Sequence, residues 1–135
     1  MMWLLVGAGG ALGSMARHGL NHFVHQRQLS SAFPLGIFII NLLGSIVIGA
    51  VGGLVASGRW SLSLEARTFI VVGMLGGFTT FSSFSFDTLT LARDGRLLLA
   101  VWNVIGQVGL SLLGVWAGYR LPIARLSVAV LARSR

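Results

Sequence analysis

Long apolar stretches alternate with short polar or arginine-containing segments along this chain of 135 residues. A helix that crosses a bilayer needs about 20 apolar residues, and four stretches approach or exceed that length. They predict transmembrane helices over residues 3–20, 34–56, 68–91 and 97–119. Helices suit a bilayer because each pairs its own backbone polar groups. We therefore expect an all-α membrane protein with one four-helix domain over residues 1–135, including a basic tail over residues 120–135.

The composition excludes an ordinary soluble fold. Hydrophobic residues make up 55% of the chain and charged residues 10%, whereas a soluble domain carries about a quarter charged residues. The chain has no cysteine, which excludes disulfides and thiolate metal sites. The N-terminus lacks the positive start of a signal peptide, so we expect it to be retained in the first helix.

Glycines recur four residues apart in every predicted helix. The pairs are Gly9 and Gly13, Gly49 and Gly53, Gly73 and Gly77, and Gly114 and Gly118. This spacing places each pair on one helix face, where a neighbouring backbone can approach closely. We expect most pairs to pack helices within one subunit. Four helices alone enclose little space for a pore, so we also expect an oligomer.

The arginines bear on partners and on orientation. Ten arginines and three acidic residues give a net charge of +7. Because the arginines are dispersed around the apolar stretches, they favour lipid headgroups over nucleic acid. Six would lie on the N-terminal side of the membrane (Arg59, Arg67, Arg120, Arg125, Arg133, Arg135) and four on the other (Arg17, Arg27, Arg93, Arg96).

Arg133 and Arg135 are farthest from a membrane end, where the orienting effect is weakest. Without these two residues, the two sides carry equal numbers of arginines. The balance predicts insertion in both orientations. The alternative is that one flanking residue, such as Arg17, fixes a single orientation.

The third predicted helix contains a polar run in its middle, over residues 76–85, with two glycines, two threonines and three serines. A membrane helix can break at such a run, which exposes carbonyl groups on one side and N–H groups on the other. Carbonyl groups suit a cation and N–H groups suit an anion. Phe78, Phe81 and Phe84 are three apart and predict one helix face. That face either packs in the core or presents positive ring edges to an anion.

Further amides lie at membrane depth. Asn41 interrupts the second helix, and Asn103, Gln107 and Ser111 are spaced four apart in the fourth. Such amides either form hydrogen bonds to another helix or line a water-filled pathway. The middle of each predicted helix contains no carboxylate, which argues against a proton-coupled exporter.

The chain shows no set of nucleophile, base and acid, so we do not expect an enzyme. The three histidines, His18, His22 and His25, come at the end of the first helix or just beyond it. Histidines spaced three and four apart can bind a metal on a helix. The alternative is that they are solvated at the membrane interface.

Three segments carry specific motifs. They are the first-helix set Gly9, Gly10, Gly13 and Arg17, the second-helix segment from Gly36 to Asn41, and the third-helix run Gly76-Gly77-Phe78-Thr79-Thr80-Phe81-Ser82-Ser83-Phe84. These motifs resemble those of the Fluc (CrcB) fluoride channels, a family of small four-helix membrane proteins of bacteria and archaea. The resemblance covers nearly the whole chain, and the third-helix run is highly specific.

The resemblance implies a fluoride-selective channel that exports fluoride passively across a prokaryotic inner membrane and prevents its toxic accumulation. It implies an antiparallel, dual-topology homodimer with two pores. The implied pore residues are Asn41 as a donor, Phe81 and Phe84 as rings, and Ser82, Ser83 and Ser111. The carbonyl groups of Gly76 and Thr79 would hold a structural sodium ion on the dimer axis.

The chain departs from the family pattern at four positions. His18 and Asn103 replace tyrosines, Gln107 replaces a common serine, and Asp87 replaces a frequent glutamate. The roles of Asn103, Gln107 and Asp87 stay open. The alternatives are a small multidrug-type exporter, which would need a mid-membrane carboxylate that this chain lacks, and a membrane assembly subunit, which would leave the polar third helix unexplained.

Overall fold

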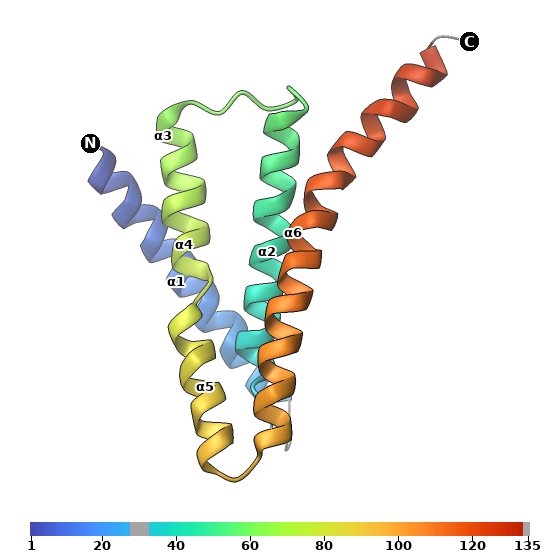
Figure 1. Ribbon diagram of the computed structural model, residues 1–135. Helices are drawn as coiled ribbons and strands as arrows, with labels where there is room; N and C mark the ends of the chain where they lie inside the picture. Colours follow the sequence, from blue (N-terminus) through green and yellow to red (C-terminus); the bar gives the residue numbers. More distant parts are fainter. Residues whose placement is uncertain (28–32, 134–135) are drawn as a thin grey trace.

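The protein is all-helical in the part that the structure describes, residues 1–27 and 33–133 of a computed structural model (Figure 1). Side chains are described up to Pro122. The elements are α1 (Met2–Arg27), α2 (Leu35–Ala56), α3 (Leu64–Arg67), η1 (Thr68–Leu75), α4 (Gly76–Phe78), α5 (Phe81–Arg93) and α6 (Leu97–Arg133). The element η1 is a π-helix, and it joins α3 to α4 in one helical column over residues 64–78.

The helix ends differ from the predicted spans mainly at α1 and α6. Helix α2 ends at Ala56 and α6 begins at Leu97, as predicted, whereas α1 continues to Arg27 and α6 to Arg133. Hydropathy locates an apolar segment, but the hydrogen-bond ladder of a helix can continue into polar sequence, so the two ends need not coincide. The side chains of Arg125 and Arg133 and the whole of Arg135, in the predicted basic tail, lie outside the described residues.

Among the described residues, three helical stretches are long and apolar enough to cross a membrane: Leu35–Ala56, Leu64–Arg93 and Leu97–Pro122. Helix α1 has 26 residues, which is also sufficient length. Its second half contains Arg17 and three histidines, so its apolar character is weaker. The membrane crossing of α1 stays a prediction.

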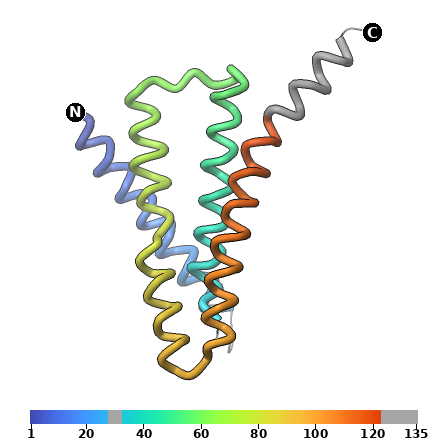
Figure 2. Tube along the Cα trace, viewed as in Figure 1, coloured from blue at the N-terminus to red at the C-terminus, as the bar shows by residue number. Residues whose placement is uncertain are grey.

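Helices α2 and α6 lie side by side (Figures 1 and 2), and glycines lie at their contact. A Cβ atom at Gly49 would overlap the carbonyl of Val115, and one at Gly118 would overlap the carbonyl of Ile46. Because only glycine leaves this space, the two backbones approach closely. These glycines therefore pack helices within one subunit, which confirms the prediction.

The second glycine contact joins α1 to the column of η1 and α4. A Cβ atom at Gly13 would overlap the carbonyl of Met74, and one at Gly77 would overlap the carbonyl of Gly10. Figure 1 shows α1 crossing this column at a slant, behind it in that view. The molecule thus consists of two close helix pairs, α1 with the column and α2 with α6.

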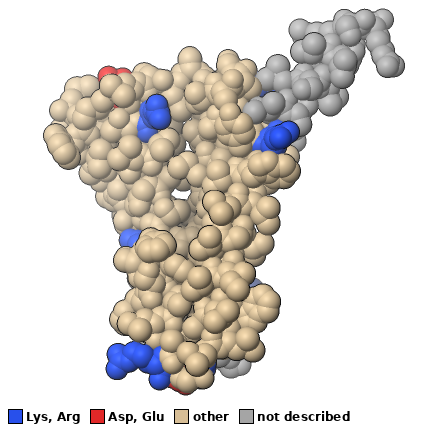
Figure 3. Space-filling view, viewed as in Figure 1, with Lys and Arg blue, Asp and Glu red and all other residues tan. Residues whose placement is uncertain are grey.

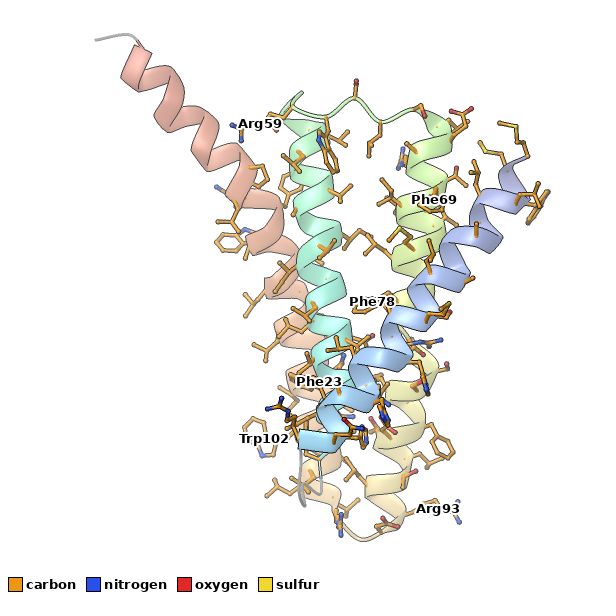
Figure 4. The ribbon with its side chains drawn as sticks, turned by 180° about the vertical axis from the view of Figure 1, so that it is seen from behind. Phe23, Arg59, Phe69, Phe78, Arg93 and Trp102 are labelled. Carbon is orange, nitrogen blue, oxygen red and sulfur yellow. The ribbon has the colours of Figure 1, made fainter. Side chains whose placement is uncertain are left out.

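Charged side chains gather mainly at the two ends of the face in Figure 3, and the surface between them is almost entirely uncharged. Arg59 and Arg93 mark opposite ends in Figure 4. Many large apolar side chains point outward, including Ile105 at 58% exposed and Leu112 at 67%. An apolar belt between two charged ends is the arrangement expected of a helical bundle in a bilayer.

Candidate functional site

The helical column is interrupted at residues 79–80, about midway along the molecule. Helix α4 ends at Phe78, and Thr79 is extended, with φ −83° and ψ 154°. Thr80 is also extended, with φ −151° and ψ 115°, and α5 begins at Phe81. Figure 1 shows this connection as a thin link between α4 and α5. Backbone groups next to the interruption therefore need partners other than the helical ladder.

Asn41 of α2 supplies partners for Thr80. The backbone N–H of Thr80 donates to Asn41 Oδ1 at 2.8 Å, and Asn41 Nδ2 donates to the carbonyl of Thr80 at 3.1 Å. The amide thus bonds the extended residue as a neighbouring β-strand would. Thr80 is only 8% exposed, so loss of either bond would leave a buried polar group unpaired. Asn41 therefore braces the interruption from α2.

The side chain of Thr80 caps the helix that follows. Its Oγ1 accepts from the backbone N–H of Ser83 at 3.3 Å and donates to Ser83 Oγ at 3.1 Å. A further hydrogen bond of 3.2 Å joins Thr80 Oγ1 and Ser82 Oγ. Threonine favours this N-cap position because its oxygen replaces a missing helical acceptor. Thr80 thus fixes the first turn of α5.

These bonds release two carbonyl groups from their usual helical donors. In an α-helix the carbonyl of Gly76 would accept from Thr80 N–H, which here donates to Asn41. The carbonyl of Thr79 would accept from Ser83 N–H, which here donates to Thr80 Oγ1. Carbonyl oxygens are ligands that hard cations accept. The two carbonyl groups implied as sodium ligands are therefore chemically suited to a cation.

Most predicted site residues line one cavity of about 360 Å³ between α2, the column, α5 and α6. The predicted residues around it are Asn41, Gly76, Thr79, Phe81, Phe84 and Ser111. Thr80 and Gln107 also line it. Side chains from distant parts of the sequence thus meet at the interruption. The lining of this cavity carries no formal charge.

Ser82 and Ser83 face a different cavity, of about 600 Å³. It lies between α1, α2 and α5, and its lining includes Asn21, His25 and Asp87. The hydroxyl of Thr80, which lines the first cavity, bonds to both serines. The interruption therefore lies between the two cavities, and the structure divides the predicted pore residues between them.

The phenylalanines do not share one helix face, so that prediction was wrong. Phe78 ends α4 and Phe81 begins α5, and the extended residues between them break the helical spacing. Phe78 lies at mid-height of the molecule in Figure 4. The rings of Phe81 and Phe84 do lie together, with centroids 5.3 Å apart and planes at 58°. Phe84 is 7% exposed and Phe81 76% exposed, so only Phe84 is enclosed by this subunit.

The α6 amides are deeply buried. Asn103 is 1% exposed, and its Nδ2 donates to Thr88 Oγ1 at 2.9 Å. Gln107 is 6% exposed. Within the described part of the chain, neither polar atom of the Gln107 amide has a partner, nor has Asn103 Oδ1. A buried amide without partners is costly and calls for a ligand or water.

The histidines make local contacts at the end of α1. His22 Nε2 lies 2.8 Å from Gln26 Nε2, and His25 Nδ1 bonds the carbonyl of Asn21 at 2.9 Å. Among the residues with described side chains, no three His, Cys, Asp or Glu groups come together as metal ligands. The metal alternative therefore gains no support from the geometry.

Thr80 belongs to the polar run that the sequence marks, but its role as the cap of α5 was not predicted, and Thr88, which receives the Asn103 bond, was not predicted as a site residue. A signal for Thr80 existed, because a threonine before an apolar-periodic helix is a typical N-cap. No sequence signal indicated Thr88, because Asn103, which donates to its hydroxyl, is on another helix.

The site and fold define a class: a small multi-pass helical membrane protein with an uncharged cavity, mainly apolar but with several amide and hydroxyl groups, beside an interrupted helix. Residues 4–119 match the family described as CrcB-like protein, Camphor Resistance (CrcB). This chain belongs to the CrcB family, which confirms the resemblance of its sequence motifs.

Relatives in several organisms bear one name, fluoride-specific ion channel FluC. The protein of Rhodospirillum rubrum is 47% identical over 120 residues, which cover 88% of this chain and 92% of that protein. The protein of one Thermus thermophilus strain is 47% identical over 119 residues, covering 88% and 91%. The protein of Opitutus terrae is 44% identical over 119 residues, covering 87% and 89%.

Proposed function

We propose that this protein is a fluoride-selective channel that exports fluoride passively. The observation that carries the proposal is the uncharged cavity at the interruption, lined by neutral donors and by the paired rings of Phe81 and Phe84. Fluoride is small and strongly hydrated, so a pore must replace its water with close donors. A fixed charge at the centre would hold the ion too tightly for rapid release. The names of the relatives support this function.

The proposed donors to fluoride come from α2, α5 and α6. Asn41 uses one amide hydrogen for the Thr80 carbonyl, which leaves the second for an anion. Gln107 offers a buried amide on the opposite helix that has no partner among the described side chains, and Ser111 offers a hydroxyl one turn further along. The ring edges of Phe81 and Phe84 carry the positive part of the aromatic quadrupole. Ser82 and Ser83 would receive the ion in the second cavity.

Passive export is sufficient for this ion. Hydrogen fluoride is a weak acid that enters cells in neutral form and dissociates in the more alkaline cytoplasm. The trapped anion then leaves down its electrochemical gradient through a channel, without a coupling ion or nucleotide. We propose that the protein works in this way in a prokaryotic inner membrane.

We further propose that the working form is an antiparallel homodimer with two pores and four transmembrane helices in each subunit. The third of these would be the column and α5, broken at residues 79–80. Phe81 supports a dimer because the residue is 76% exposed although it lines the cavity beside Phe84. A second subunit would complete the wall on that side.

We propose a structural sodium ion on the axis of this dimer. The carbonyl groups of Gly76 and Thr79 would hold it, since both have lost their usual helical donors. The ion would supply fixed positive charge between the two interrupted helices and stabilise their contact. Its ligands would come equally from both subunits.

Purified protein in liposomes is expected to release fluoride and to retain chloride. The donors that line the first cavity are neutral, and a small ion can approach such donors more closely than a large one, so fluoride gains most from them. A fluoride electrode and a chloride electrode, used on matched vesicles without a proton gradient, measure the two fluxes. Comparable fluxes of the two ions would contradict fluoride selectivity. Proton-dependent cation export would indicate the exporter instead, and no flux of either ion would indicate the assembly subunit.

Dual topology gives a separate prediction. Adding three lysines after Arg135 should bias the chain to one orientation and abolish fluoride release by cells, because an antiparallel pair can no longer form. Co-expression with a chain biased the opposite way, by lysines in the 93–96 turn, should restore release. Reporters fused to the C-terminus measure orientation directly. A reporter found on only one side in the unmodified protein would disprove dual topology.

A further inference from the structure

Asn103 makes a directional contact from α6 to α5. Its Nδ2 donates to Thr88 Oγ1 at 2.9 Å, and Thr88 Oγ1 donates to the carbonyl of Phe84 at 2.8 Å. A hydroxyl has one hydrogen, and the carbonyl can only accept, so the roles in this chain of bonds are fixed. The side chain of Asn103 is therefore linked through Thr88 to the backbone of Phe84.

Both ends of this link are buried. Asn103 is 1% exposed and Phe84 7% exposed, so neither can exchange this arrangement for contact with lipid or water. Threonine in a helix divides between two χ1 rotamers, and the bond to the carbonyl four residues earlier selects one of them. The Asn103 bond holds the same rotamer from the other helix.

We propose that Asn103 is a positioning residue for Phe84. Through Thr88 it sets how the Phe84 turn of α5 lies against α6, and hence where the ring stands in the cavity that also contains Gln107. This inference rests on the proposed channel function. It assigns Asn103 a role in the pore without contact between Asn103 and the ion.

The chain offers a matched control for the threonine. Thr90 makes the same type of bond as Thr88, from its Oγ1 to the carbonyl of Phe86 at 2.9 Å, on the exposed face of α5. Thr88→Val and Thr90→Val are therefore the same change in the same helix. They differ in the contact to Asn103.

Two measurements test the proposal. One is fluoride flux in liposomes, and the other is the fluorine NMR signal of 4-fluorophenylalanine placed at position 84 in the assembled protein. Thr88→Val should lower flux by about tenfold or more and shift or broaden the signal. Thr88→Ser keeps the hydroxyl and should restore both to nearly the original values. Thr90→Val should leave both close to the original values.

Thr88→Val leaves the Asn103 amide buried without its partner and could prevent assembly. The double variant Asn103→Leu with Thr88→Val removes both polar groups, so it should assemble more readily. It should still show the altered signal and the low flux. Its effects should fall well short of the sum of the single effects of Asn103→Leu and Thr88→Val, because both residues belong to one link.

The proposal would be overturned if both Thr88→Val and the double variant kept the fluoride flux of the unmodified protein and an unchanged fluorine NMR signal. Low flux with an unchanged signal would also overturn it, because the ring would then be in place. If the unmodified protein releases no fluoride, the channel function fails instead. The fluorine signal still tests the link to Phe84 in that case.

Discussion

Replacing Asn41 by leucine is expected to lower fluoride flux by about a hundredfold. The variant keeps the bulk of the side chain but removes both bonds to Thr80 and the free amide hydrogen offered to the ion. Two buried backbone groups would lose partners, at about 1–3 kcal/mol each, and a tenfold change corresponds to about 1.4 kcal/mol. Flux from liposomes with equal amounts of assembled protein gives the result.

Two roles of Asn41 can be separated by hydrogen exchange at the Thr80 amide. If Asn41 braces the interruption, exchange of this amide should become much faster in Asn41→Leu. Asn41→Asp retains an acceptor for the Thr80 N–H and should keep the amide protected, while its lost donor and added charge still reduce flux. Full flux in Asn41→Leu would remove Asn41 from the pore. Low flux with an unchanged exchange rate of the Thr80 amide would show that Asn41 acts only as a donor to the ion.

Replacing Phe84 or Phe81 by isoleucine is expected to lower fluoride flux by about tenfold or more while the protein still folds and assembles. Isoleucine keeps an apolar side chain but has no ring quadrupole for an anion. Apolar exchanges that nearly conserve volume usually cost less than about 1.5 kcal/mol, so folding should survive. Within one subunit Phe84 is 7% exposed and Phe81 76% exposed, so the exchange should weaken the packing of a single subunit more at Phe84 than at Phe81. Flux and thermal unfolding in detergent measure the two effects.

Phe78→Ile is the matched control for this pair. Phe78 ends α4 and packs near Gly44 of α2, in a helix segment separate from the other two rings. Its replacement should change stability or assembly before it changes flux. Full fluoride flux in both Phe81→Ile and Phe84→Ile would show that the two rings only pack in the core and do not contact the ion. The pore would then depend on Asn41 and the hydroxyl groups.

The sequence alone determined the features that depend on local composition. Apolar length identified the helical segments, and α2 ends and α6 begins where this predicts. Glycines four residues apart identified close helix contacts, because the absence of a side chain is what allows two helix backbones to approach each other. The polar run over residues 76–85 marked the region of the cavity, since hydroxyl groups and amides are unusual at this depth. The specific third-helix motif then gave the family.

Only the tertiary structure decided which distant groups meet. Asn41 could be recognised as polar at membrane depth, but its pairing with Thr80 depends on how α2 lies beside the interruption. The same holds for Asn103 and Thr88, and for the separation of Ser82 and Ser83 from the other predicted residues. The pattern also placed three phenylalanines on one face, because periodicity assumes a continuous helix. A pattern records the kind of each side chain, whereas a hydrogen bond requires a partner within about 3 Å, and packing alone brings one there.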